Sequence, residues 1–184
     1  VDLITGYTNL SLAANPFGGE LLIHDSGASV KGSSLIVWDG PDGDPDTIDY
    51  TGLGGVDLLQ SGSLDAFELG FLAADLTGDL MLTVFDAGDA TGGTWSQAVI
   101  SLPVELFIPV DFQIPYSSFT AVGSNGAADF ANVGAISLEM CNLTTGSLDV
   151  QLGAVSAVPE PASGVLGLLA LAIGLACGRS FLRG

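Results

Sequence analysis

The stretch Val133-Gly-Ala-Ile-Ser-Leu-Glu-Met140 alternates apolar and polar side chains with a period of two. Successive side chains of an extended chain point to opposite faces, so one set is expected to face a core. That set is Ile136, Leu138 and Met140, and Ser137 and Glu139 are expected to face away from the core. Leu80-Met-Leu-Thr-Val-Phe85 is apolar on both faces, which predicts a strand in the middle of a sheet.

Short apolar and β-branched segments recur throughout residues 1–157, and glycine, aspartate, asparagine and proline separate them. The predicted strands lie within 1–14 and at 20–24, 34–38, 56–59, 66–69, 80–85, 95–102, 104–114, 133–140 and 148–155. Pro103, Pro109 and Pro115 remove hydrogen-bond donors from the segment 104–114, which is therefore placed at a sheet edge or at a crossing between sheets. No segment has the 3.6-residue period of an amphipathic helix. The pattern predicts one all-β domain, an antiparallel β-sandwich over residues 1–157.

The C-terminal end has a different composition. Val158-Pro-Glu-Pro161 is followed by an uncharged run at 162–178, and residues 179–184 contain two arginines. At about 1.5 Å of rise per residue the run spans roughly 26 Å as a helix, close to the thickness of a hydrocarbon core. The positive-inside rule keeps the basic end in the cytoplasm. This predicts a single-pass membrane protein whose domain lies outside the cytoplasm, and hence a cleaved export signal before Val1.

The motif Pro159-Glu160-Pro161, the span at 162–178 and the basic residues Arg179 and Arg183 together resemble the PEP-CTERM sorting signal. The resemblance implies recognition by an exosortase and a place in the envelope or extracellular matrix of a Gram-negative bacterium. It thus implies a span in the bacterial inner membrane, with the domain in the periplasm and the C-terminus in the cytoplasm. Family tails usually have a denser arginine cluster, whereas residues 180–182 separate the two arginines here. The alternative is a membrane anchor that no enzyme processes.

The segments 75–84, 112–119 and 129–136 resemble jelly-roll outer domains found on many PEP-CTERM proteins. Those domains are related in shape to carbohydrate-binding modules. This second resemblance therefore implies a jelly-roll fold and no particular activity.

The chain contains 21 acidic residues against 3 lysines and arginines, a formal net charge of −18. Lys31 is the only lysine or arginine before residue 158. Such a surface repels nucleic acid and anionic lipid head groups, so the expected partners are basic proteins, divalent cations or neutral glycans. A surface that is only well solvated is the alternative. The two cysteines, Cys141 and Cys177, lie in the domain and in the span, so no disulfide is expected between them.

One loop is dense in carboxylates, namely Asp39, Asp42, Asp44, Asp46 and Asp49. Calcium prefers several oxygen ligands on a flexible loop, which makes this loop a candidate calcium site. Pro45 interrupts the spacing, and the glycine and glutamate of an EF-hand are missing. The alternative is an exposed acidic turn. No other cofactor is expected.

Trp95 follows Thr91-Gly-Gly-Thr94, and at such a loop edge its ring could be exposed to stack on a sugar. Tyr7, Tyr50 and Tyr116 could contribute to the same kind of platform, and Trp38 is expected in the core. His24 is the only histidine and is placed at a strand end beside Asp25, so it is not expected to act as a base or ligand. No nucleophile elbow occurs, and no catalytic residue is predicted.

Gly174 and Gly178 have the small-xxx-small spacing that lets membrane helices approach closely. The leading expectation is a non-enzymatic accessory subunit whose helix and acidic periplasmic domain stabilise a larger membrane protein assembly, for example an electron-transfer or photosynthetic complex. The alternative is a sorted envelope or matrix protein that binds glycans. A hydrolase is the third and weakest class, because so many carboxylates make a suitably spaced pair uninformative.

Overall fold

The computed structural model describes residues 2–5, 10–14, 22–41, 44, 47–102, 106–142 and 146–159. The predicted span at 162–178, the basic tail at 179–184, Glu160, Pro161, Gly174 and Gly178 lie outside these residues, as do Tyr7 and Cys177. Within the described part, no helix has both the length and the apolar character needed to cross a bilayer.

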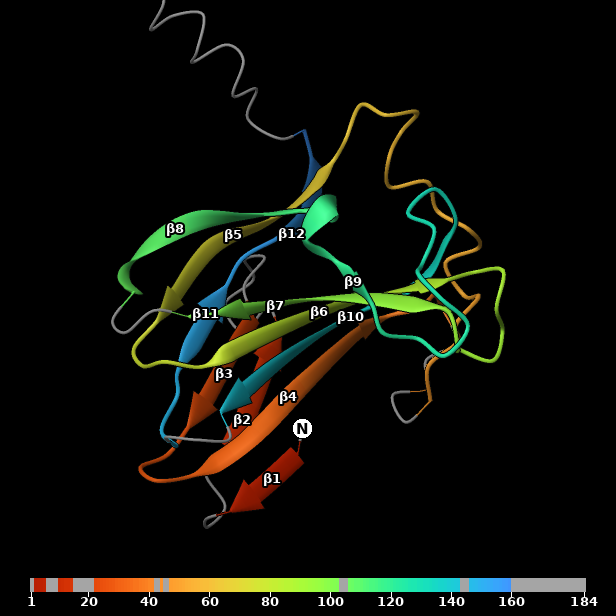
Figure 1. The fold of residues 1–184 in the computed structure, drawn as a ribbon. Coiled ribbons are helices and arrows are strands. Elements are labelled where there is room, and N and C mark those ends of the chain that lie inside the picture. The colour runs from red at the N-terminus through yellow and green to blue at the C-terminus, as the bar shows by residue number, and fades with distance from the viewer. Residues whose placement is uncertain are drawn as a thin grey trace, which may run out of the picture.

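One antiparallel sheet, sheet A, has six strands. In spatial order they are β1 (Asp2–Thr5), β4 (Lys31–Trp38), β10 (Val133–Asn142), β6 (Asp79–Asp86), β7 (Trp95–Ser101) and β9 (Thr120–Ala121) (Figure 1). The strand β6 lies between β10 and β7, which confirms its predicted central place.

The second antiparallel sheet, sheet B, also has six strands. Five of them follow the order β12 (Val155–Val158), β5 (Ala66–Ala74), β11 (Val150–Leu152), β3 (Leu22–Ser26) and β2 (Leu10–Ala14). The sixth, β8 (Leu106–Pro115), pairs with β5 alone and continues into the short 3₁₀ helix η1 (Tyr116–Ser118). The proline-containing segment therefore lies at a sheet edge, as predicted.

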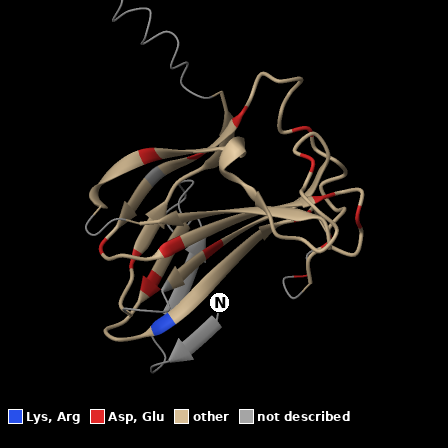
Figure 2. Cartoon of the chain, viewed as in Figure 1, with Lys and Arg blue, Asp and Glu red and all other residues tan. Residues whose placement is uncertain are grey.

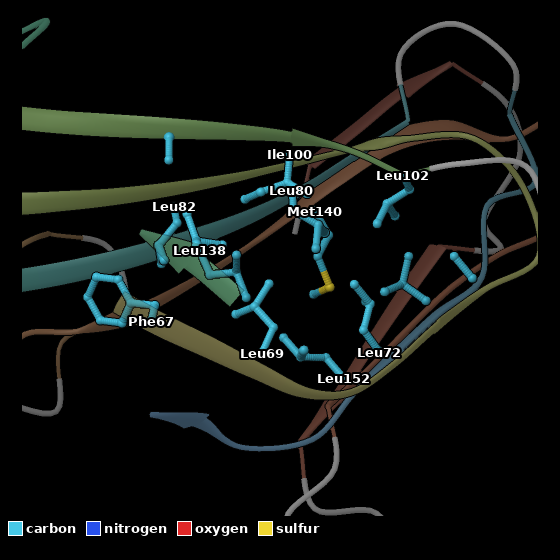
Figure 3. Packing of buried hydrophobic residues seen from close by; sticks show 14 of the residues in the cluster. Phe67, Leu69, Leu72, Leu80, Leu82, Ile100, Leu102, Leu138, Met140 and Leu152 are labelled. Atoms are coloured by element: carbon cyan, nitrogen blue, oxygen red, sulfur yellow. The ribbon is translucent and has the colours of Figure 1, made fainter. Parts of the chain in front are cut away.

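The two sheets pack face to face and bury one apolar core between them. Side chains of sheet B such as Leu69 and Leu152 lie in the same cluster as Leu82, Leu138 and Met140 of sheet A (Figure 3). The expected inward residues of β10 are confirmed, since Leu138 and Met140 are fully buried and Ile136 packs against the cluster. The all-β antiparallel sandwich is thus confirmed.

One predicted strand is absent from the structure, and two others are each divided into two strands. Residues 56–59 form no strand, because the carboxylate of Asp57 accepts the backbone N–H groups of Leu59 and Gln60 and so folds a turn. The segment 1–14 contains two strands that belong to different sheets.

The segment 148–155 is also divided, into β11 and β12. Its Gly153 donates to the carbonyl of Gly70, and Gly70 donates to the carbonyl of Ala154, at 2.7 and 2.9 Å. These bonds fall where the register of β5 shifts between Leu69 and Leu72. A bulge in the partner strand therefore interrupts the pairing that the sequence pattern suggests.

Candidate functional site

The outer face of sheet A points away from the core and combines aromatic, polar and apolar side chains. The outward positions of β7 and β6 form opposed pairs in the register, Trp95 with Phe85, Gln97 with Thr83 and Val99 with Met81. Their neighbours in sequence, including Leu82, Val84 and Ala98, belong to the core cluster. The period-two alternation of these strands therefore separates the side chains that face the core from those that face outward.

Three aromatic rings meet at one end of this face. The ring centroids of Tyr50 and Phe85 lie 5.1 Å apart, and those of Phe85 and Trp95 lie 6.1 Å apart. The ring of Tyr50 is packed against the backbone of Gly92, which has a φ of +70° and leaves no room for a Cβ. A Cβ on Gly123 would approach Cδ1 of Trp95 to 2.7 Å. Two glycines therefore let backbone close onto these rings and fix their positions, with Trp95 half-buried.

A row of uncharged hydrogen-bonding side chains crosses the sheet beside the aromatic rings. The amide Nε2 of Gln97 donates to the hydroxyl of Thr83 at 3.1 Å, and Ser137 of β10 lies opposite Thr83 in the register. The next row contains Glu139 opposite Met81, and Leu35 of β4 opposite Glu139. Leu35 and Val99, at the two ends of that row, are 45% and 59% exposed. Thr83 and Ser137 are buried, whereas Gln97 and Glu139 are half-buried. This face can therefore contact the flat apolar side of a ligand and hydrogen-bond its polar edge through Gln97 and Glu139.

The predicted calcium loop is described only in part, because Asp42 and Asp46 lie outside the described residues. Asp39 is buried, and its Oδ2 accepts the backbone N–H of Asp49 at 2.9 Å. The backbone N–H and hydroxyl of Thr51 both donate to Asp49 and hold the pKa of that carboxyl below its usual value. The Oδ2 of Asp44 accepts the Thr47 hydroxyl at 2.8 Å.

Nowhere in the described part do three or more histidine, cysteine, aspartate or glutamate side chains gather closely enough to hold a metal ion. The described carboxylates of the loop act as acceptors that shape the loop itself. Calcium binding stays a prediction, since two of the five proposed ligands are not described.

Another loop carboxylate, which sequence reasoning did not single out, organises the aromatic end of sheet A. Asp89 accepts the hydroxyl of Thr91, the amide of Asn125 and the hydroxyl of Thr94, and these donors hold its pKa well below the usual range. Asn125 comes from the loop after β9 and Thr94 directly precedes Trp95. The carboxylate thus ties two loops together beside the ring of Trp95.

Asp25, Asp75 and Asp149 approach one another from distant parts of the chain. Burial raises the pKa of Asp149, a hydrogen bond from the backbone of Ser26 opposes this, and the nearby charges of Asp75 and Asp25 raise it further. Asp75 accepts the backbone N–H of Asp149 at 2.8 Å. Sequence spacing could not reveal this meeting, which arises from the pairing of β3, β11 and β5.

His24 is not a strand-end residue, and that prediction was wrong. The strand β3 continues to Ser26, and the His24 side chain points into the sandwich with no exposed surface. Its Nδ1 is 2.7 Å from the hydroxyl of the equally buried Ser34 on β4. Within the described part of the chain its Nε2 has no hydrogen-bond partner. The pair links the two sheets, and its burial keeps it out of reach of a substrate.

The remaining aromatic predictions divide between core and surface. Trp38 packs against the core cluster, as expected. Tyr116 belongs to an aromatic group with Phe67, Phe119 and Phe130 and is not a surface platform. Its burial, with a smaller effect of Asp65, raises the pKa of its hydroxyl to about 12. Trp95 and Tyr50 remain at the outer face of sheet A.

No family model matches the chain, and no curated protein matches it. The solution structure of a family 11 carbohydrate-binding module aligns with a TM-score of 0.46 and 12% identity, over 86% of this chain and 88% of that chain. The family 11 module of a cellulosomal cellulase from Clostridium thermocellum gives a TM-score of 0.43 and 13% identity over 83% and 81% of the two chains. The Clostridium thermocellum module in complex with a β-1,3-1,4-mixed-linked tetrasaccharide gives 0.41 and 12% over 86% and 94%. Similarity at this level is too low to carry a function to this chain.

Proposed function

We propose that the described domain is a binding module for neutral glycan chains and that the outer face of sheet A is its ligand surface. The observation that carries this proposal is the half-buried ring of Trp95, which packs against the buried Phe85, beside the half-buried Gln97. The buried Thr83 accepts a hydrogen bond from the Gln97 amide and so orients it. A sugar ring has an apolar face that an indole can cover and a rim of hydroxyls that amides and hydroxyls can bind.

The charge of the chain favours a neutral ligand. With a net charge of −18 the protein repels polyanionic polysaccharides, and the residues of the row beside Trp95 are uncharged. Figure 2 shows acidic residues spread over both sheets and the loops, so no face of the described domain offers a basic patch to an anion. Glu139, half-buried in the next row, can accept hydrogen bonds from sugar hydroxyls.

The C-terminal tail would hold this module at the cell envelope, by sorting or by anchoring. The earlier expectation of a subunit in a membrane assembly depends on residues 162–178, which are not described, and it stays a prediction. Glycan binding is preferred to the assembly role because the side chains that would contact the glycan belong to the described residues.

The test is binding of the full chain in mild detergent to a panel of glycans, measured by affinity electrophoresis and calorimetry. Neutral polysaccharides such as β-glucan, xylan and mannan are expected to bind, and alginate and polygalacturonate are not. Trp95→Ala and Gln97→Ala are each expected to weaken binding by about tenfold or more, because each removes a contact worth ~1.4 kcal/mol or more.

Val110→Ala is the matched control, because Val110 is also partly exposed but lies on β8, away from this face. Gln97→Ala changes a half-buried surface side chain and is expected to leave the fold intact, which circular dichroism can verify. Unchanged affinity in both outer-face variants, or preferential binding of polyanions, would refute the proposal.

A further inference from the structure

A groove runs along the open side of the sandwich, between β7 of sheet A and β8 of sheet B. We call it the β7–β8 groove. It has a volume of about 350 Å³ and is lined mainly by apolar side chains, among them Ala98, Ile100, Phe112 and Ile114. The two strands run along the same side of the molecule (Figure 1). This volume lies within the usual range for binding pockets.

The side of β7 that borders the groove has an unused sheet edge. β7 pairs with β6 along its whole length, whereas β9 pairs only with Ser96 and Gln97. Backbone groups of Trp95 and Gln97 accept hydrogen bonds from residues 120–123 on the β9 side. Backbone groups two residues apart point to the same side of a strand, so Val99 and Ser101 direct theirs to this edge. No described strand pairs with them there.

Exposed apolar side chains gather beside this edge. Half of the large hydrophobic side chains that are exposed in the described part belong to β8, namely Phe107, Ile108, Val110 and Phe112. Of these four, Phe112 lines the groove, and Val99, which is 59% exposed, lines its β7 side. Pro109 and Pro115 deprive β8 of N–H donors, so β7 is the better template for a further strand.

The charges around the groove specify the occupant. Asp111 lies on β8, and Asp79 accepts the hydroxyl of Ser101 at the end of β7. The basic Lys31 is on β4, which β10 and β6 separate from β7. A second copy of this chain would bring a further net charge of −18, so it would be repelled.

We propose that the β7–β8 groove binds an extended segment of a partner protein, apolar at alternate positions and basic at both ends. Its backbone would pair with Val99 and Ser101, its apolar side chains would fill the groove, and its basic ends would lie near Asp111 and Asp79. This is strand addition to an open sheet edge. It is a second binding surface, which borders the outer face of sheet A and shares Val99 with it.

The probe is a synthetic peptide, Lys-Val-Thr-Val-Thr-Val-Lys, titrated by fluorescence anisotropy against the full chain at low salt. A peptide with glutamate at both ends is expected to bind about tenfold more weakly, and this difference should shrink as salt is added. Hydrogen exchange at residues 98–101 is expected to slow when the lysine peptide binds.

Two variants test the backbone pairing at the β7 edge and the apolar contacts in the groove separately. Val99→Pro removes a donor from the free edge without removing a bond to β6, and Phe112→Asp places a charge in the groove; each is expected to weaken peptide binding at least about tenfold. Leu35→Asp is the control, because Leu35 is about as exposed as Phe112 but lies on the outer face of sheet A. This variant is expected to change the affinity for the peptide by less than about twofold. Equal binding of both peptides, unchanged exchange at 98–101, or self-association that protects these amides without peptide would each overturn the proposal.

Discussion

At the scale of single residues, the buried His24 couples the stability of the domain to pH. Burial lowers the pKa of its imidazole below the usual 6.5, and the charge of the neighbouring Asp25 only partly opposes this. The unfolded chain therefore binds a proton more readily than the folded one below pH 6.5. The contribution of His24 to stability is present above 6.5 and is lost as the pH falls toward its folded pKa.

We therefore predict that acid destabilises the domain through His24. Urea unfolding between pH 4.5 and 7.5 should show the free energy of unfolding falling as the pH is lowered, by at most about 1.4 kcal/mol per pH unit for one proton. His24→Asn can keep a polar contact with Ser34 but has no group that gains a proton in this range. Its free energy of unfolding should therefore vary less with pH. Equal slopes in the two proteins below pH 6.5 would show that His24 is not the group responsible.

Sequence reasoning located Trp95 at the edge of a possible sugar platform but missed the residues around it. The signal for Gln97 and Thr83 was present, because the alternation in 80–85 and 95–102 places them on the same side as Trp95 and Phe85. Their pairing requires the register between β6 and β7, which no local pattern specifies. His24 was misplaced because its strand extends two residues beyond it, to Ser26, and Ser34, its partner, comes from the other sheet.

At the scale of elements, β10 and β6 hold the centre of sheet A and carry much of the core. Leu138 has no exposed surface and lies opposite Leu82 in the register. We predict that Leu138→Ala lowers the free energy of unfolding by about 2–5 kcal/mol, because it removes buried methyl groups and leaves a cavity. Leu35→Ala on the outer face should cost less than about 1 kcal/mol. Denaturant unfolding of both variants measures this, and equal losses would contradict the assignment of faces.

Strand existence could be predicted wherever a period-two pattern was bounded by turn residues, as for β6, β7 and β10. This prediction was wrong where a side chain bonds nearby backbone, as at Asp57. Its carboxylate accepts the backbone N–H groups that a strand would use for pairing. The prediction was also wrong where a partner strand decides the boundary, as at Gly70, which divides β11 from β12. Such contacts link residues far apart in the sequence and leave no local trace.

At the scale of the whole molecule, the sandwich carries two surfaces of different character. The outer face of sheet A is mixed and suits a polar chain with apolar sides, whereas the β7–β8 groove is apolar with acidic surroundings. The tail after residue 159 would place both at the envelope. The composition and charge of the tail predict a membrane span. No sequence pattern indicates which surface of the domain stays accessible to a ligand.

We predict that the tail is removed in the native host. Peptide mapping of the protein recovered from the cell envelope should find peptides from the domain and none from residues 162–184, because a sorting enzyme would cleave near the Pro-Glu-Pro motif. Recovery of the complete tail in a stoichiometric membrane complex would instead favour the assembly subunit.

The measurement that tests the central claim most directly is a titration of the isotopically labelled full chain with the tightest neutral oligosaccharide of the panel, followed in amide NMR spectra. Glycan binding to the outer face of sheet A predicts shifts concentrated at residues 81–85, 95–99 and 137–139, with the amides of β8 unchanged. Shifts confined to β8 and the groove, or no shifts at saturating sugar, would contradict it.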